Sequence, residues 1–152
     1  MVREDDRGAD RSKEKDAKRV PLPLLGAAWL IPGFGHWLLG KRRRAVVFGA
    51  VIVCAFVTGV LVDGELGTPR PGEPFSWLAT IACLGNGVLY VARLLWLNGS
   101  GIFSGGFPLG LVGGGDPVSS GFVYGNTFLY TSGLMNLLAV LDVSDIYRGE
   151  KD

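Results

Sequence analysis

The feature that most constrains this chain is the confinement of its charges to short segments between long apolar blocks. Seven Lys/Arg and six Asp/Glu lie within the first nineteen residues, and only six charged residues lie between Ala45 and Leu141. A soluble fold would distribute charge along every exposed helix face or strand. The blocks between the charged segments are Val20–Gly40, Ala45–Val62, Pro74–Ala92 and Pro117–Leu141. Their lengths match the roughly 17 to 25 residues of a membrane-crossing helix, which indicates a membrane protein.

The blocks predict an all-α integral membrane bundle of about four transmembrane helices. We expect spans over residues 22–40, 45–62, 75–97 and 122–141, within a helical membrane domain of residues 20–147. The second block, "AVVFGAVIVCAFVTGVLV", is apolar on every face, whereas a soluble helix would show a polar face. Ala55 and Gly59 in this block lie four residues apart, as do Ala79, Cys83 and Gly87 in the third block. This spacing favours close helix packing, although small residues also occur there by chance.

The segments outside the spans differ in composition. Residues 1–19 mix both signs of charge with almost no apolar side chains, which predicts a disordered cytoplasmic tail. Residues 98–121 contain nine glycines and one charge, which predicts either a translocated surface loop or a shallow re-entrant element. Residues 148–152 form a short C-terminal tail. The formal net charge of +1 provides no bulk electrostatic case for nucleic-acid binding.

The first block contains a motif, "IPGFGHWLLGKRRR", that predicts a break followed by an anchor. Pro32, Gly33 and Gly35 should kink the helix or fold it into a re-entrant hairpin, and Gly40 precedes the charged turn. Aromatic and cationic side chains of this kind settle at the membrane interface. The expected anchor residues are Trp37, Lys41, Arg42, Arg43 and Arg44.

The orientation depends on whether this first block crosses the membrane. If all four blocks cross, the cationic tail and Lys41–Arg44 lie on opposite faces, and one of them violates the rule that cationic loops stay cytoplasmic. If the block is re-entrant, both clusters share the cytoplasmic face and the C-terminus lies outside. Counting cations does not separate the two. The uncharged glycine-rich loop and the ending "SDIYRGEKD" favour four full spans with both termini cytoplasmic.

His36 is the only histidine in the chain, and imidazole is the side-chain group best suited to proton transfer, so His36 is a candidate for a proton relay or a ligand. A relay needs partners, and no acid lies nearby in the sequence, so only a tertiary contact could supply one. The alternative is an interfacial or hydrogen-bonded structural histidine.

A candidate intramembrane polar site comprises Arg93, Asn136, Asp142 and Asp145. Arg93 follows nineteen uncharged residues, so it either extends to the headgroups or pairs with Asp142 or Asp145. The two acids lie three residues apart on one helix face, which suits acid/base chemistry, a cation site or a solvated helix end.

Other chemistry has little support in the sequence. Cys54 and Cys83 both fall inside predicted spans and are expected to be free, buried thiols. No cluster of His, Cys, Asp or Glu has metal-ligand spacing, and no catalytic motif occurs, so we expect no metal, no cofactor and no enzymatic activity.

Two resemblances add to this interpretation. The stretch "AAWLIPGFGHWLLGKRRRAVVFGAVI", with the ending "GNTFLYTSGLMNLLAVLDVSDIYRGEKD", resembles a bacterial family of small multi-pass membrane proteins of unknown function with a P-G-x-G-H motif. The first stretch is more distantly similar to the two-helix transmembrane domain family, whose motif has Arg and Tyr where this chain has Trp37 and Leu38. These resemblances imply a compact helical domain in a membrane and no particular activity.

The expected function is therefore that of an accessory, scaffold or assembly partner of other membrane proteins in the bacterial cytoplasmic membrane. Its expected partners are the lipid bilayer and a membrane protein or a second copy of the chain. The alternative is an oligomeric transporter or channel component that uses the intramembrane polar residues.

Overall fold

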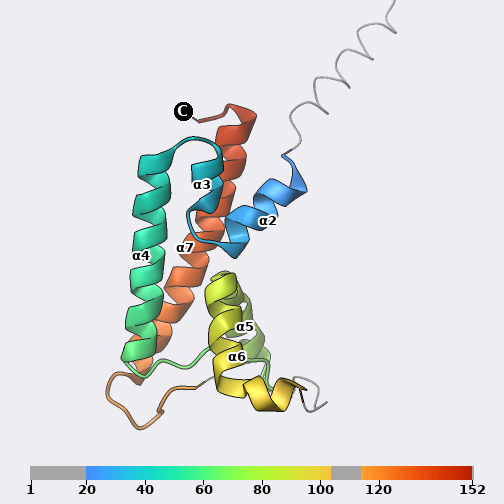
Figure 1. Cartoon of the computed structure of the whole chain (residues 1–152). Helices are drawn as coiled ribbons and strands as arrows, with labels where there is room; N and C mark the ends of the chain where they lie inside the picture. The colour runs from blue at the N-terminus through green and yellow to red at the C-terminus, as the bar shows by residue number, and fades with distance from the viewer. Residues whose placement is uncertain (1–19, 104–113, 152) are drawn as a thin grey trace, which may run out of the picture.

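A computed structural model describes residues 20–103 and 114–151, and every regular element in these two ranges is a helix (Figure 1). The helices are α2 (Leu22–Leu30), α3 (Phe34–Leu38), α4 (Arg42–Leu61), α5 (Pro74–Leu84), α6 (Val88–Phe103) and α7 (Phe122–Arg148). The all-α prediction is confirmed for this part of the chain. The predicted disordered tail, residues 1–19, and residues 104–113 of the predicted glycine-rich loop lie outside the described residues.

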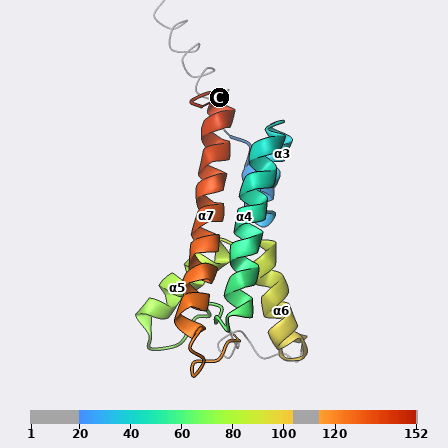
Figure 2. The ribbon, with the colours of Figure 1, turned by 90° about the vertical axis from the view of Figure 1, so that its left-hand side faces the viewer.

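Helices α4 and α7 form the long axis of the molecule. They contain 20 and 27 residues, which correspond to about 30 and 40 Å of helix. Each is long and apolar enough to cross a membrane. They run antiparallel and side by side in both views (Figures 1 and 2). A Cβ atom added at Gly59 would lie 2.9 Å from the carbonyl oxygen of Gly125, so the expected close packing at Gly59 is confirmed.

The first block is broken into two short helices. Its kink lies at Ile31–Gly33, where Gly33 has φ +81° and packs against the α4 backbone at Ala45. The predicted break at Pro32–Gly35 is therefore confirmed, and residues 22–40 contain two short helices. Helix α2 runs toward the middle of the bundle, and α3 returns toward the end where α7 finishes (Figure 1).

The third block is also broken, which the sequence analysis did not predict. Helix α5 ends at Leu84, and the segments Pro74–Leu84 and Val88–Gly99 meet at 118°. Gly87, with φ +59°, occupies the bend. The prediction of about four spans is confirmed only in part: within the described residues, two single helices qualify as spans by length and composition, or three spans if this bent pair counts as one. Residues 98–103 of the predicted loop belong to α6.

The two breaks meet beside the middle of α7. A Cβ atom at Gly87 would collide with the carbonyl oxygen of Trp29 at the end of α2. One at Gly85 would collide with the carbonyl oxygen of Gly133 on α7. Glycine is required at these positions because three pieces of backbone pack directly against one another. The contact holds the ends of α2 and α5 together inside the bundle.

Candidate functional site

The motif histidine is buried and pairs with a partly buried acid from the far end of the sequence. His36, on α3, is 1% exposed, and its Nε2 lies 2.9 Å from Oδ2 of Asp142 on α7. The neighbouring Gly35 permits this approach, because a Cβ atom there would lie 2.8 Å from the side chain of Val143. The ring of Phe48 on α4 covers the imidazole, with ring centroids 5.0 Å apart. The tertiary contact that a functional His36 requires is therefore present.

The other carboxylate oxygen of Asp142 is engaged by the C-terminal segment. Nζ of Lys151 donates to Oδ1 of Asp142 at 2.9 Å and lies 3.7 Å from Asp145. The chain reverses at Gly149, which has φ +74°, and the amide of Glu150 donates to the carbonyl of Asp145. This hydrogen-bond pattern is a Schellman motif, which ends α7. The hydrogen bond from Lys151 to Asp142 raises the pKa of the exposed lysine above its ordinary value.

This cluster lies at the rim of a groove between α4 and α7. The groove has a volume of about 460 Å³. Its lining residues are Phe48, Met135, Leu138, Ala139, Leu141, Asp142, Asp145 and Lys151. The arrangement is an apolar floor with charged groups at one end. Asp142 links His36, inside the bundle, to Lys151, which is exposed.

A second polar group lies in the interior, where the helix breaks meet. The Nδ2 group of Asn136 donates to the carbonyls of Trp29 and Gly85, each at 2.8 Å. Nδ2 of Asn86 donates to the carbonyls of Cys83 and Leu129, and its Oδ1 accepts from Ser132 at 2.8 Å. Carbonyls at interrupted helix ends lack partners within their own helix, so these amides donate to the ends of α2 and α5, while the bond to Leu129 links the bend to α7. The interior polar group is accounted for by the need to complete the broken helices.

Two side-chain polar atoms in the described part of the chain are buried without a hydrogen-bond partner. They are Nδ1 of His36 and Oδ1 of Asn136. Buried polar atoms are normally bonded, so each of these has unused bonding capacity. They belong to different groups: His36 lies with Asp142, and Asn136 lies at the helix breaks.

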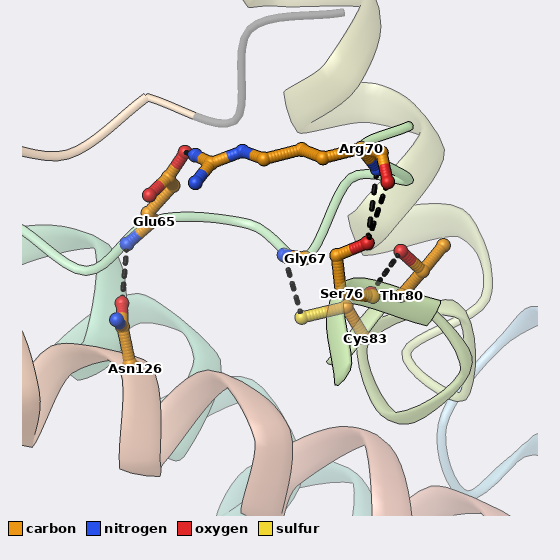
Figure 3. A network of polar contacts seen from close by, with 7 residues as sticks. All are labelled: Glu65, Gly67, Arg70, Ser76, Thr80, Cys83 and Asn126. Carbon is orange, nitrogen blue, oxygen red and sulfur yellow. Dashed lines mark hydrogen bonds and ion pairs between the residues drawn. The ribbon is translucent and has the colours of Figure 1, made fainter. Parts of the chain in front are cut away.

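A third polar group holds the segment between α4 and α5 at the opposite end of the bundle (Figure 3). The amide of Glu65 donates to Asn126 at 2.6 Å, and its carboxylate forms an ion pair with Arg70. The amide of Gly67 donates to Sγ of Cys83 at 3.3 Å. Side chains thus replace the backbone partners that an irregular segment lacks. Cys83 is buried as expected, whereas Cys54 is exposed; both are free thiols.

The predicted polar site is divided by the fold. Asp142 and Asp145 lie with His36, and Asn136 lies at the breaks. The guanidinium of Arg93 points instead toward Gly114, in the segment that leads into α7. Asp142 lies twenty residues beyond the start of α7, about 30 Å along the helix. The suggested pairing of Arg93 with Asp142 or Asp145 is therefore wrong.

The predicted anchor residues gather at the α3–α4 corner. Arg42 begins α4, so the helix starts three residues before the predicted span, and its guanidinium lies 5.5 Å from the ring centroid of Trp37. Gly40, with φ +75°, ends α3, and the amide of Lys41 donates to the carbonyl of His36 at 2.9 Å. Arg43 and Arg44 are exposed in the first turn of α4. Pro32 and Gly33 pack against α4 at Gly49 and Ala45.

The sequence analysis missed several residues of these groups. Lys151 was assigned to a tail, and Asn86, Ser132 and the indole of Trp29 were not selected. A usable signal existed for Asn86, because "GNG" interrupts an apolar block. Within residues 20–103 and 114–151, no three His, Cys, Asp or Glu side chains are grouped so as to hold a metal ion.

Comparison with known protein families assigns the chain to one of them. The sequence model of a family of unknown function, DUF6677, matches residues 24–152. The chain belongs to this family. The match includes all the described helices except the first two residues of α2. No curated protein and no solved structure matches the chain. With two helices able to cross a membrane, it is a membrane-associated member of a family of unknown function.

Proposed function

We propose that the chain is a multi-pass protein of the bacterial cytoplasmic membrane, with two crossing helices and two re-entrant hairpins. Helices α4 and α7 would cross, while α2–α3 and α5–α6 would enter from opposite faces and meet at the middle of α7. The bonds from Asn136 to the ends of α2 and α5 support this arrangement, since buried protein can complete broken helices at membrane depth. Both hairpins return to the face they entered from.

This topology removes the conflict between the two cationic clusters. The start of α4, which carries Arg42–Arg44, lies at the same end of the bundle as the end of α7. The segment between α4 and α5, which carries Arg70, and α6, which carries Arg93, lie toward the other end (Figure 1). Cationic segments remain cytoplasmic, so the first end would face the cytoplasm. The tail, residues 1–19, would then leave α2 on that face.

Labelling of single cysteines tests this topology. In a Cys54→Ala background, we expect Lys41→Cys and Glu150→Cys to react with a membrane-impermeant maleimide only after the cells are opened. Glu73→Cys and Val118→Cys should react in intact cells. Reaction of Lys41→Cys and Glu150→Cys from opposite faces would contradict the proposal.

Its proposed role is non-enzymatic: an accessory, scaffold or assembly partner for another membrane protein. The observation that carries this role is an apolar cleft of about 490 Å³ between α5 and α7. Its lining residues are Phe75, Leu78, Ala79, Ile81, Ala82, Tyr130 and Leu134. Phe75 and Leu78 are 82% and 68% exposed. A transmembrane helix of a partner, with large apolar side chains, suits such a cleft better than mobile lipid tails.

Photocrosslinking in native membranes tests this role. A photoreactive residue at Leu78 should yield one discrete adduct with a membrane protein that also co-purifies at a fixed ratio. The same probe at Val51, an exposed position on α4, should not. Leu134→Trp, which fills the cleft, should abolish the adduct, while Leu61→Trp on α4 should leave it intact. Adducts with lipid alone would overturn the role, and an adduct with a second copy would identify a homo-oligomer.

The alternative is an oligomeric transporter or channel component. It is favoured by the meeting of two helix C-termini in the interior, beside the unpartnered Oδ1 of Asn136. Transporters build substrate and ion sites at such interruptions. Under our leading proposal, proteoliposomes containing the chain show no more proton or sodium flux than empty liposomes. Flux that disappears in Asn136→Ala would favour the alternative.

A further inference from the structure

The corner between α3 and α4 contains two hollows of opposite character. The first, of about 320 Å³, is lined by Gly40 and the four cations Lys41–Arg44. The second, of about 150 Å³, is apolar. It is lined by Ile31, Pro32, Gly33, Phe34, Trp37, Ala45 and Val46. The two are neighbours, because the guanidinium of Arg42 from the first lies over the ring of Trp37 from the second.

The described lining of the cationic hollow contains no acidic residue. No acid occurs in α3 or in the first turn of α4. Among the described residues of α7, Asp142 pairs with His36 and Lys151, and Asp145 lies within reach of Lys151. Four cations on consecutive residues repel one another, so an anion bound between them would relieve that repulsion. Guanidinium groups bind phosphate through paired hydrogen bonds.

The apolar hollow opens on the outside of the bundle. Ile31, Trp37 and Val46 are 46%, 50% and 60% exposed. The corner that carries both hollows is fixed in shape: Gly40 ends α3 with the bond from Lys41 to His36, and Gly33 packs on α4. A fixed pair of hollows, one cationic and one apolar, suits an amphiphile rather than a free ion.

We propose that this corner is a binding site for an anionic phospholipid. The phosphodiester binds at Arg43 and Arg44, and the upper part of an acyl chain lies on Pro32, Phe34 and Val46. Trp37 separates the two parts of the lipid, with Arg42 stacked on it. The site goes beyond a general attraction of cations to the membrane, because it selects a head group and a chain together at one place.

A lipid titration by native mass spectrometry tests this site. The full-length protein in neutral detergent is titrated separately with phosphatidylglycerol, phosphatidylcholine and inorganic phosphate. We expect phosphatidylglycerol to bind about tenfold more tightly than phosphatidylcholine, with no phosphate adduct. Each cation near a lipid surface changes affinity by about fivefold, so Arg43→Gln together with Arg44→Gln should remove this preference.

Two further variants make the result decisive. Arg148→Gln removes a cation from the same end of the bundle but outside the hollows, and it should retain the preference. Val46→Trp fills the apolar hollow and should weaken binding of both lipids while all four cations remain. If Arg148→Gln lowers the preference for phosphatidylglycerol as much as Arg43→Gln alone does, general charge attraction explains the binding and the proposal fails. Binding of inorganic phosphate as tightly as of phosphatidylglycerol would also overturn it.

Discussion

Backbone hydrogen bonds are completed differently in two parts of the molecule: the continuous helices α4 and α7, and the broken pairs α2–α3 and α5–α6. A continuous helix bonds its own backbone, so apolar side chains suffice to place it in a membrane. A broken helix leaves carbonyls at its ends without their usual partners, and here Asn86, Asn136 and Trp29 supply donors to them. Breaks therefore need particular residues at particular places, whereas the long helices need only a composition. Substitutions at the breaks should destabilise the protein far more than substitutions along α4.

The largest expected effect is at Gly133. In Gly133→Ala the new Cβ atom would collide with the carbonyl oxygen of Ala82, which is backbone and has little freedom to move. We expect a loss of about 3 kcal/mol of unfolding free energy, at the upper end for overpacked sites, or no folded protein. Denaturant titration in detergent measures it. Gly26→Ala, in a helix with open space around it, is the control and should not destabilise. Equal stability of the two variants would show that the break does not pack as described.

The second-largest loss of unfolding free energy is expected for Asn136→Leu. It leaves the carbonyls of Trp29 and Gly85 without their donor inside the bundle, which should cost about 2 to 3 kcal/mol. Thr127→Val is the matched control on the same helix, because its hydroxyl bonds only to the carbonyl of Val123. The same titration compares them, and an Asn136 effect no larger than that of Thr127 would count against the bridging role.

His36→Phe should have a smaller effect. The substitution keeps an aromatic ring beside Phe48 but leaves Asp142 with Lys151 alone. Because Asp142 can still reach water, we expect about 1 to 2 kcal/mol. His36→Gln, which can still donate to Asp142, should recover part of the loss. No difference between the two variants would show that the hydrogen bond is unimportant.

The smallest change in stability is expected on replacing Lys151, and it depends on pH. Its pKa is raised in the folded state, so its contribution is fully present below the ordinary pKa of 10.5 and is lost as the pH rises through the raised value. The wild-type thermal midpoint should therefore fall more steeply above pH 10.5 than that of Lys151→Gln. Parallel pH profiles would refute the predicted link to Asp142.

The continuous helix α4 was predictable from composition, whereas the breaks were only partly predictable. The block Ala45–Val62 corresponds closely to α4, and the break at Pro32 was evident because proline and two glycines interrupt an apolar run. The break at Gly85–Gly87 was missed because glycine alone is common in membrane helices, so "GNG" was not distinguished from a packing motif. The partner of His36 was missed because Asp142 is separated from it by 106 positions.

The sequence alone indicates a membrane protein, because its apolar blocks have spanning lengths and its charges are confined between them. It also determined that the first block bends. Only the tertiary structure decided which polar residues meet, pairing His36 with Asp142 and Asn136 with two helix ends, and directing Arg93 elsewhere. The reason is physical. Burial follows from local composition, whereas a hydrogen bond depends on a separation of a few ångströms set by packing across the whole chain.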